Sequence, residues 1–449
     1  MTDLSKIVKA YDVRGVVPEQ LDGDIARALG AAFARFAGSP SIVIARDMRE
    51  SGVPLGLAFA EGAMAQGVDV IDAGLGSTDL LYFASGTLGV PGAMFTASHN
   101  PAQYNGIKLC LGGARPVGQD TGLAQIRADA ERFLAEGVPS TGTGSRTEQD
   151  LLPSYAAFVK GLVLGLDSIR PLKVVVDAGN GMGGYTVPAV LQGLPLEVIP
   201  MYFELDGSFP NHEANPIEAE NMRDLQAKVL EVGADLGLAF DGDADRCFVV
   251  DEKGGIVSPS VLTGLIAERE LARVPGSVVI HSLITSRAVP EVIREHGGTP
   301  VVTRVGHSFI KAEMAAHDAV FGGEHSGHFY FRDFWNADSG MLAALHALAA
   351  LGGQPGPLSG LLSTYARYVD SGEINSTVAD TAAKLVEITA RYAGHPQDEM
   401  DGLTVDLGDG AWFNVRPSNT EPLLRLNVEA RDEATMVRTR DDVLAVIRG

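Results

Sequence analysis

The sequence has few cysteines: two, Cys110 and Cys247, in 449 residues. A single cross-link could not hold a chain of this length together, and no cysteine pair has zinc-ligand spacing. A disulfide-rich scaffold and a cysteine zinc site are therefore excluded. Residues 1–6 contain no apolar signal region, and no run approaches the ~18 apolar residues of a membrane span. We expect a cytoplasmic protein without a membrane partner.

Aromatic residues and positive charges are also scarce. Aromatics make up 6% of the chain, and the formal net charge is −22. The few rings argue against a base-stacking surface, and so acidic a chain repels nucleic acid and anionic membranes. An anionic metabolite would be repelled as well unless basic side chains converge at one place. Arginines and lysines near glycine-rich turns are therefore candidates for a binding site.

Hydrophobic residues, in contrast, make up 45% of the chain, which is long enough for several domains of ~150 residues. β-Branched runs alternate with Ala- and Leu-rich stretches, a pattern typical of parallel sheets covered by helices. The pattern occurs three times along the chain. The predicted strands are 41–45, 68–72 and 92–95, then 173–177, 196–200 and 236–240, then 277–281, 300–303 and 319–321.

In each of these stretches the third predicted strand leads directly into a polar loop. The three loops are 96–101 (TASHNP), 241–246 (DGDADR) and 322–328 (GGEHSGH). Ligands of open α/β sheets bind beyond the carboxyl ends of the strands, where all three loops lie. We therefore predict three similar units that contribute equivalent corners to one cleft.

The C-terminal part of the chain breaks this rhythm. Strands predicted at 373–376, 403–406, 412–415 and 423–428, with helices at 379–392 and 433–447, indicate a small antiparallel α+β domain. The predicted domains are 1–145, 146–250, 251–368 and 369–449.

Three aspartates, Asp241, Asp243 and Asp245, alternate along the loop that follows a buried strand. Carboxylates with this spacing converge if the chain bends around a hard divalent cation, and a solvated acidic turn is the alternative. An EF-hand is excluded, because the sixth loop position holds Arg246 instead of glycine and both flanks are predicted strands. Arg246 is also suited to a bidentate grip on a phosphate.

Ser98 follows the apolar segment 93–95 in a turn that ends at Asn100-Pro101, so its hydroxyl is expected at the edge of the sheet. A turn-capping serine is the ordinary explanation of such a residue. The G-x-S-x-G elbow of hydrolases is absent, so acyl transfer is not predicted. A phosphorylated serine would carry a charge of about −1.5 to −2 and oxygens suited to the cation of the aspartate loop.

Two further segments have phosphate-binding composition. The segment 416–422 (RPSNTEP) joins two predicted strands, and its arginine, hydroxyls, amide and turn N–H groups are the parts of a phosphate cradle; a plain hairpin turn is the alternative. The segment 179–184 (GNGMGG) formally fits the dinucleotide pattern G-x-G-x-x-G. No acidic residue stands cleanly at the end of the next strand, so we interpret it as a close-packed strand–helix turn.

Together the four loops resemble the α-D-phosphohexomutases over essentially the whole chain and in the family's order. They are similar to its phosphoserine loop (96–101), metal loop (241–246), sugar loop (322–328) and phosphate loop (416–422). The segment 11–15 (YDVRG) and the pair Gly306-His307 also look like family signatures. The resemblance implies three similar α/β domains with mixed, mostly parallel sheets, and a smaller C-terminal α+β domain, around a central cleft.

The resemblance also implies an activity and its residues. A phosphomannomutase/phosphoglucomutase interconverts hexose 1-phosphate and hexose 6-phosphate, here through phospho-Ser98, Mg²⁺ and a hexose 1,6-bisphosphate that is both intermediate and activator. The implied metal ligands are Ser98, Asp241, Asp243 and Asp245. The implied catalytic residues are Ser98, Lys108, His328 and Arg14. The implied substrate-binding residues are Tyr11, Arg246, Gly306, His307, Glu324, Ser326, Arg416, Ser418, Asn419 and Thr420.

Within the family, Ser-Asn-Thr at 418–420 and Ala244 look more like the mannose/glucose branch than the phosphoglucosamine branch. Ile284 stands where many relatives carry a lysine, which removes one candidate proton-transfer or phosphate contact and leaves the hexose preference open. A phosphosugar is the implied partner, and we expect a monomer or a weak dimer. The alternatives are a phosphoglucosamine mutase, a metal-dependent sugar-phosphate phosphatase and a non-catalytic phosphosugar-binding protein.

Overall fold

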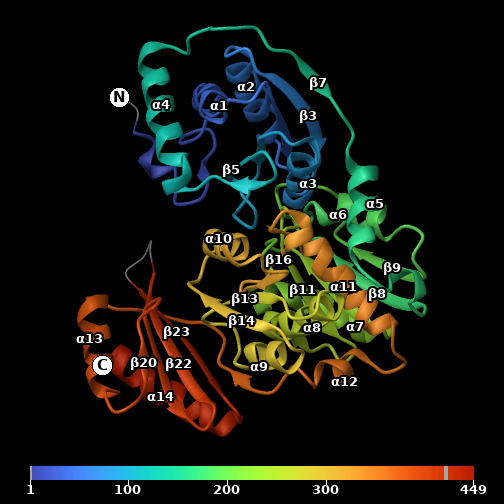
Figure 1. Cartoon of the computed structure of the whole chain (residues 1–449), viewed down its shortest axis with the longest axis vertical. Coiled ribbons are helices and arrows are strands. Elements are labelled where there is room, and N and C mark those ends of the chain that lie inside the picture. Colours follow the sequence, from blue (N-terminus) through green and yellow to red (C-terminus); the bar gives the residue numbers. More distant parts are fainter. Residues whose placement is uncertain (1–2, 419–422) are drawn as a thin grey trace. The chain divides into compact units, whose positions relative to one another are not determined.

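The computed structural model describes residues 3–418 and 423–449. The chain forms two compact units, one of residues 1–258 and 326–359 and the other of residues 259–325 and 360–449 (Figure 1). Within the described ranges, no helix has the length and apolar character needed to cross a membrane.

The first sheet of the first unit is mostly parallel. Its strands are β1 (Val13–Val16), β2 (Ser41–Arg46), β3 (Asp69–Leu75), β4 (Gly92–Phe95), β5 (Tyr104–Leu111), β6 (Arg115–Pro116) and β7 (Arg146–Glu148). They lie in the order β1-β5-β4-β2-β3-β7, with β6 beside β5. Strands β4, β2, β3 and β7 are parallel, whereas β5 returns antiparallel to β4. This return strand, which the sequence analysis did not predict, begins just after the loop of Ser98.

Four helices cover this sheet: α1 (Gly23–Ala37), α2 (Gly52–Met64), α3 (Thr78–Leu88) and α4 (Leu123–Glu136). Helix α1 packs against α2 and α4, and α2 and α3 contact the central strands. The core between them is aromatic and aliphatic, with the rings of Phe33, Phe59 and Phe95 in contact. Strand β4 is buried from end to end, and the loop that contains Ser98 follows at its carboxyl end, at the edge of the sheet.

The second sheet repeats this arrangement. Its elements are α5 (Leu152–Leu162), β8 (Leu172–Asp177), α6 (Gly183–Leu191), β9 (Leu196–Met201), α7 (Arg223–Val232), β10 (Leu236–Phe240), β11 (Cys247–Asp251) and β12 (Ile256–Val257). The strand order is β12-β11-β10-β8-β9, with β9, β8 and β10 parallel and β11 antiparallel to β10. The aspartate loop is therefore the tight connection of the β10–β11 hairpin.

The rest of the first unit comprises β16 (Phe329–Phe331), β17 (Ala337–Asp338) and α11 (Gly340–Gly352). Helix α11 contacts α5 and β11. An aromatic cluster joins α3, α5 and the turn before β17: Phe158 lies 5.3 Å from both Phe83 and Trp335, measured between ring centroids. Residues far apart in sequence thus share one core.

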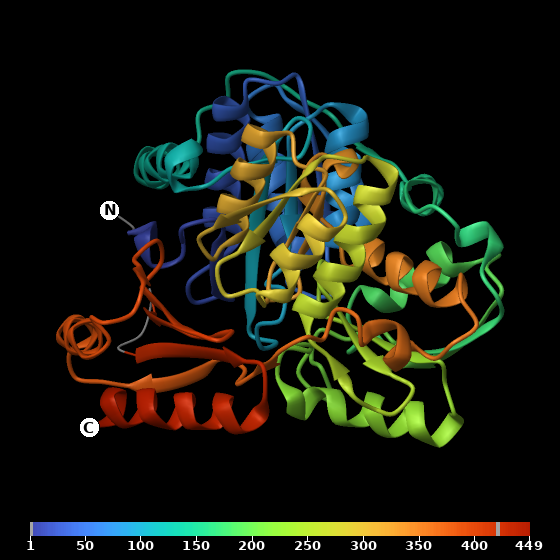
Figure 2. The same ribbon diagram turned by 60° about the horizontal axis from the view of Figure 1, so that its bottom comes forward.

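The second unit contains a parallel sheet and an antiparallel one. The parallel part comprises α8 (Pro259–Arg273), β13 (Val278–Ser282), α9 (Ala288–Glu295), β14 (Thr299–Thr303), α10 (His307–His317) and β15 (Phe321–Gly323), with strand order β14-β13-β15. Helix α12 (Leu358–Leu362) precedes the C-terminal elements. These are β18 (Val369–Asp370), β19 (Ile374–Thr377), α13 (Thr381–Arg391), β20 (Gln397–Asp398), β21 (Leu403–Gly408), β22 (Ala411–Pro417), β23 (Leu423–Ala430) and α14 (Glu433–Arg448). Figure 2 shows α14, in red, along one face of the antiparallel sheet, where it contacts β22 and β23.

All strands predicted from the sequence are present, with ends that differ by a few residues. The predicted fold class, three α/β domains with mixed, mostly parallel sheets and a C-terminal α+β domain, is confirmed by the sheet topology. Strand β11 agrees with the strand predicted on the flank of the aspartate loop. The strands without a predicted counterpart are β1, β5, β6, β7, β12, β16, β17, β18 and β20, and the antiparallel return strand β5 is the longest of them.

Candidate active site

Ser98 lies in the loop that leaves β4, with its backbone in the left-handed region at φ 50° and 5% of its surface exposed. Its hydroxyl donates a hydrogen bond of 2.8 Å to Asp241 Oδ2, although 143 residues separate the two. Its backbone N–H donates to Thr96 Oγ1 at 2.8 Å. The structure therefore brings the predicted phosphoserine loop and the predicted metal loop into direct contact.

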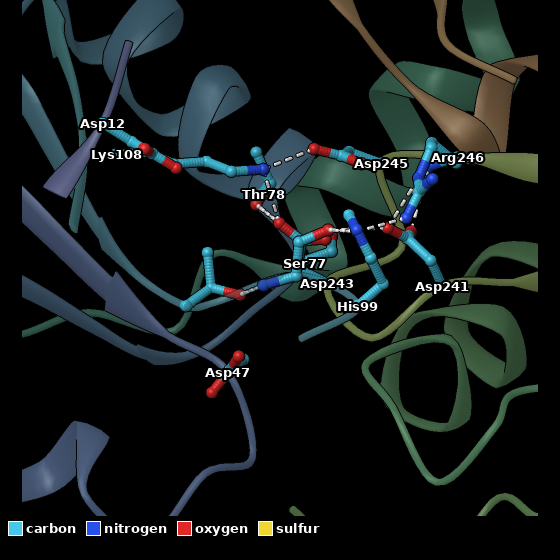
Figure 3. A network of polar contacts seen from close by, with 12 residues as sticks. Asp12, Asp47, Ser77, Thr78, His99, Lys108, Asp241, Asp243, Asp245 and Arg246 are labelled. Carbon is cyan, nitrogen blue, oxygen red and sulfur yellow. Dashed lines mark hydrogen bonds and ion pairs between the residues drawn. The ribbon is translucent and has the colours of Figure 1, made fainter. Parts of the chain in front are cut away.

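The three aspartates of the metal loop are buried: Asp241 and Asp243 are 0% exposed and Asp245 is 2% exposed. One carboxylate oxygen from each lies within 4.8 Å of the others (Figure 3). Oδ1 of Asp243 and Oδ1 of Asp245 have no hydrogen-bond partner among the described residues. Buried carboxylate oxygens without donors fit a hard divalent cation, which takes oxygen ligands and supplies the missing positive charge.

Two cations partly neutralise these carboxylates. Lys108 Nζ, from β5, lies 2.7 Å from Asp243 Oδ2 and 2.6 Å from Asp245 Oδ2, and Arg246 Nε lies 2.9 Å from Asp241 Oδ2. Burial raises the pKa of Asp241 to about 7, against the opposing charge of Arg246. Burial also favours protonation of Asp243, but the Lys108 ammonium outweighs it and holds the pKa of Asp243 well below its usual range.

His99 connects the serine to Arg246. Its Nδ1 lies 3.2 Å from Ser98 Oγ and accepts a hydrogen bond of 2.6 Å from Arg246 Nη2, because a guanidinium can only donate. Burial, followed by the charges of Arg246 and Arg14, lowers the pKa of His99 to about 2, so the ring is neutral at neutral pH. His99 lies in the loop 96–101, but its place in the site is not among the residues predicted from the sequence.

Thr78 supports the metal loop from the first domain. Its Oγ1 donates a hydrogen bond of 2.5 Å to Asp243 Oδ2, and its backbone N–H donates to Asp243 O at 3.0 Å. The next residue, Asp79, is fully buried and accepts hydrogen bonds from Ser77 Oγ, from Tyr155 Oη at 2.7 Å and from Ser339 Oγ at 2.6 Å. The sequence contained no motif for these residues, but Thr78 follows β3 at the same sheet edge as Ser98.

The glycine-rich segment 179–184 is the strand–helix turn between β8 and α6, as interpreted from the sequence. Met182 N donates to Gly242 O at 2.9 Å, and a Cβ on Gly181 would lie 2.7 Å from that oxygen. A Cβ on Gly242 would in turn lie 2.4 Å from Ser98 O. The turn packs directly beneath the metal loop, and the metal loop packs directly on the serine loop.

The other predicted residues of the first unit lie near this centre. Arg14, on β1, donates to Asn100 Oδ1 at 2.5 Å and to Asp12 Oδ2 at 2.6 Å, so it borders the serine loop. His328 Nε2 lies 3.6 Å from Asp245 Oδ1, and its Nδ1 lies 2.9 Å from Ser326 Oγ. Tyr11 is half-buried and precedes β1.

The remaining predicted residues belong to the second unit. Glu324, buried after β15, accepts a hydrogen bond of 2.9 Å from Gly306 N, and α10 begins at His307. Arg416 Nη2, at the end of β22, lies 2.6 Å from Glu373 Oε2, and Ser418 N donates to Leu423 O at 2.9 Å. Asn419 and Thr420 lie outside the described residues. Ile284, at the position noted as a departure from relatives, is 8% exposed.

Glu252, the twelfth residue counted from Asp241 and therefore the last ligand of an EF-hand loop starting there, is not part of the metal loop. Its carboxylate accepts hydrogen bonds from the backbone N–H of Ser359, at 3.0 Å, and from Ser359 Oγ at 2.5 Å. The loop is flanked by β10 and β11, two antiparallel strands, instead of the two helices of an EF-hand. The structure therefore agrees with the exclusion of an EF-hand.

Comparison with family models gives four matches along the chain. They are the phosphoglucomutase/phosphomannomutase alpha/beta/alpha domain I over residues 5–134, domain II over residues 153–255, domain III over residues 258–368, and the C-terminal domain over residues 373–446. The four matches together cover most of the sequence.

Individual relatives are similar over the full length. A phosphomannomutase of Salmonella typhimurium (strain LT2) is 40% identical over 449 residues, with 98% of each chain covered. Phosphohexose mutases of Xanthomonas campestris pv. campestris (strain B100) are 42% identical, with 98% of this chain and 99% of the relative covered. A crystal structure of a phosphoglucomutase/phosphomannomutase family protein from Burkholderia thailandensis superposes with a TM-score of 0.88 at 34% identity, covering 100% of this chain and 98% of that one.

Proposed function

The chain belongs to the phosphoglucomutase/phosphomannomutase family, and from this premise we propose that it interconverts hexose 1-phosphate and hexose 6-phosphate, with mannose and glucose as the candidate sugars. The reaction runs through a phosphoserine at Ser98 and a hexose 1,6-bisphosphate. The single observation that carries the proposal is the contact of 2.8 Å between Ser98 Oγ and Asp241 Oδ2, by which the Ser98 hydroxyl lies beside the acidic cluster.

Each half-reaction is a phosphoryl transfer. A free hydroxyl of the bound hexose phosphate attacks the phosphorus of phospho-Ser98; the new O–P bond forms, the bond between phosphorus and Ser98 Oγ breaks, and the hydroxyl proton passes to a base. The bisphosphate then turns round, its other phosphoryl group returns to Ser98, and the proton returns to the sugar. Lys108 and His328 are the candidate acid and base. Because the Lys108 ammonium contacts Asp243 and Asp245 and can only donate, it is the candidate acid, and His328, which lies beside Asp245, is the candidate base.

The acidic cluster has the donor set for Mg²⁺. Asp241, Asp243, Asp245 and phospho-Ser98 would hold it, and when bound it offsets charge on the transferring phosphoryl group. Arg14 and Arg246 border the serine loop, where they are placed to bind phosphate oxygens.

The remaining predicted residues are assigned to the rest of the substrate. Arg416, Ser418, Asn419 and Thr420 bind the phosphate that does not react; Arg416 Nε has no hydrogen-bond partner among the described residues and is available for an oxygen. Glu324, Ser326 and the Gly306-His307 pair, with Tyr11, bind the sugar, since a carboxylate accepts the hydrogen bonds that hydroxyls donate.

We also propose a four-domain division into residues 1–145, 146–250, 251–368 and 369–449. The ranges matched by the four family models support four domains in this order, but the second match ends at residue 255 and the third begins at residue 258. The pairing of β12 with β11 favours a second boundary after residue 257.

The test of the covalent role is Ser98→Ala, assayed for conversion of glucose 1-phosphate and mannose 1-phosphate to the 6-phosphates with bisphosphate activator. We expect no turnover, because the phosphoryl acceptor is lost. Near-normal turnover would refute the covalent role, and release of inorganic phosphate without a 6-phosphate would identify a phosphatase instead. The ratio of the two rates measures the hexose preference.

The test of the metal is removal with EDTA. We expect turnover to stop and to return on addition of Mg²⁺, because two oxygens of the buried aspartates have no donor in the part of the chain that the structure describes. Unchanged activity in EDTA would remove the metal from the mechanism.

A further inference from the structure

Arg49 lies between β2 and α2 and is 2% exposed. A guanidinium has five N–H groups, and every one of them has an acceptor here. Nε donates to Asp47 Oδ2 at 3.2 Å. Nη1 and Nη2 each donate to two backbone carbonyl oxygens, which belong to Ser98 (2.9 Å), Asn100 (2.6 Å), Pro101 (2.9 Å) and Tyr104 (2.9 Å). Arg49 therefore binds the backbone of one segment, residues 98–104.

This segment starts at the nucleophile. The left-handed backbone of Ser98, at φ 50°, is strained for an L-residue, so its surroundings must hold it. The carbonyl oxygen of Ser98 accepts from Arg49 Nη2 and also faces Gly242, whose added Cβ would lie 2.4 Å away. The orientation of the Ser98 backbone is thus fixed by Arg49 and by the metal loop together.

Arg49 is itself fixed on several sides. Its ion pair with Asp47 is fully enclosed, with side chains 1% and 0% exposed, and its backbone N–H donates to Asp47 Oδ1 at 2.9 Å. The ring of Phe209, from the second domain, covers the guanidinium at 5.1 Å from the ring centroid. A Cβ on Gly207 would lie 2.9 Å from Arg49 Cα, so this segment packs against the backbone as well.

We propose that Arg49 is a positioning residue for phosphoryl transfer, holding residues 98–104 so that Ser98 Oγ faces Asp241. The inference rests on the proposed function, in which Ser98 is the nucleophile. The requirement is for the planar fork and not for charge alone: a lysine carries the same charge but has three donors and no plane, so it cannot serve four carbonyls and a carboxylate at once.

The test uses the full chain with Arg49→Lys, and Arg27→Lys as the matched control, because Arg27 pairs with Asp24 and Glu61 at the surface. We expect kcat of Arg49→Lys to fall about 100-fold, as for a misplaced reacting group, with KM for glucose 1-phosphate within about twofold of the wild type. Transfer of labelled phosphate from glucose 1,6-bisphosphate to Ser98 should slow in parallel. Hydrogen exchange should accelerate in residues 96–106 and stay unchanged in the second unit.

A kcat of Arg49→Lys within about threefold of the wild type would overturn the inference, because the fork would then be dispensable. A loss of kcat with unchanged exchange in residues 96–106 would overturn it as well. If Arg49→Lys does not fold, Phe209→Leu decides instead: it removes the ring above the guanidinium, and unchanged kcat together with unchanged exchange would count against the proposal.

The readouts also separate this inference from the proposed function. Wild-type protein that neither turns over glucose 1-phosphate nor takes a phosphate on Ser98 would refute the proposed function. The exchange of residues 96–106 in Arg49→Lys requires no activity and judges the positioning role by itself.

Discussion

Thr78→Val tests how far the metal loop depends on its neighbours. Thr78 Oγ1 donates a hydrogen bond of 2.5 Å to Asp243 Oδ2, at the short end of the range for a hydroxyl bound to a carboxylate. Valine keeps the shape of the side chain and removes only this donor. A hydrogen bond to a charged acceptor contributes about 1.5–3 kcal/mol. Since about 1.4 kcal/mol is a factor of ten, the expected loss is roughly 10- to 100-fold.

We expect this loss in the affinity for Mg²⁺, since removing the hydrogen-bond partner that orients a metal ligand weakens metal binding by a factor of about this size. The assay is mutase rate against Mg²⁺ concentration, with direct binding of Mn²⁺ as a measurement that needs no turnover. Thr389→Val is the control, because Thr389 Oγ1 donates only to Leu385 O of its own helix in the second unit. An unchanged Mg²⁺ dependence in Thr78→Val would refute the reasoning that Thr78 orients Asp243.

Two further substitutions probe the supports of the site. Burial raises the pKa of Asp79 from 3.8 to about 6 in the folded protein. The contribution of protonated Asp79 to stability is therefore fully present below pH 3.8 and is lost as pH rises through 6. Chemical unfolding should show the stability of Asp79→Asn, relative to the wild type, rising by about 3 kcal/mol from acid to neutral pH, and a pH-independent difference would contradict the shift. Gly242→Ala places a Cβ 2.4 Å from Ser98 O and should lower kcat at least about tenfold. Gly161→Ala should leave kcat unchanged, because beyond the adjoining residues and backbone of its own helix no described atom lies within 4 Å of the new Cβ; equal rates in both variants would contradict the close packing.

The contact between Ser98 and the aspartate loop could be predicted from the sequence because both loops follow the third strand of a parallel unit. Parallel strands align their carboxyl ends, so each of the two loops lies at the carboxyl edge of its own sheet, although 143 residues separate Ser98 from Asp241. Segment 179–184, which formally fits the dinucleotide pattern, is the strand–helix turn that the sequence predicts. No acidic residue that could bind a ribose follows it, and its glycines pack closely against Gly242.

The supporting residues could not be predicted in the same way. Arg49 and Thr78 also follow strands of the first sheet, yet they belong to no quoted motif, and a turn residue shows nothing in the sequence of which way it points. Asp47-Met48-Arg49 directly after β2 was the available signal. Lys108 reaches Asp243 and Asp245 because β5 runs back antiparallel to β4, and that return strand was not predicted.

Both cysteines lie on strands that return from the two loops of the site. Cys110 pairs with Gly92 across β4 and β5, and Cys247 pairs with Phe240 across β10 and β11. They are 0% and 1% exposed, and burial raises the pKa of the Cys247 thiol, which suppresses the thiolate that alkylating reagents attack. A reagent such as iodoacetamide can therefore mark each hairpin only while that hairpin is open. The alkylation rate of Cys110 therefore reports opening of the β4–β5 hairpin, and that of Cys247 reports opening of the β10–β11 hairpin. Mass spectrometry can measure the two rates separately in the unmodified chain.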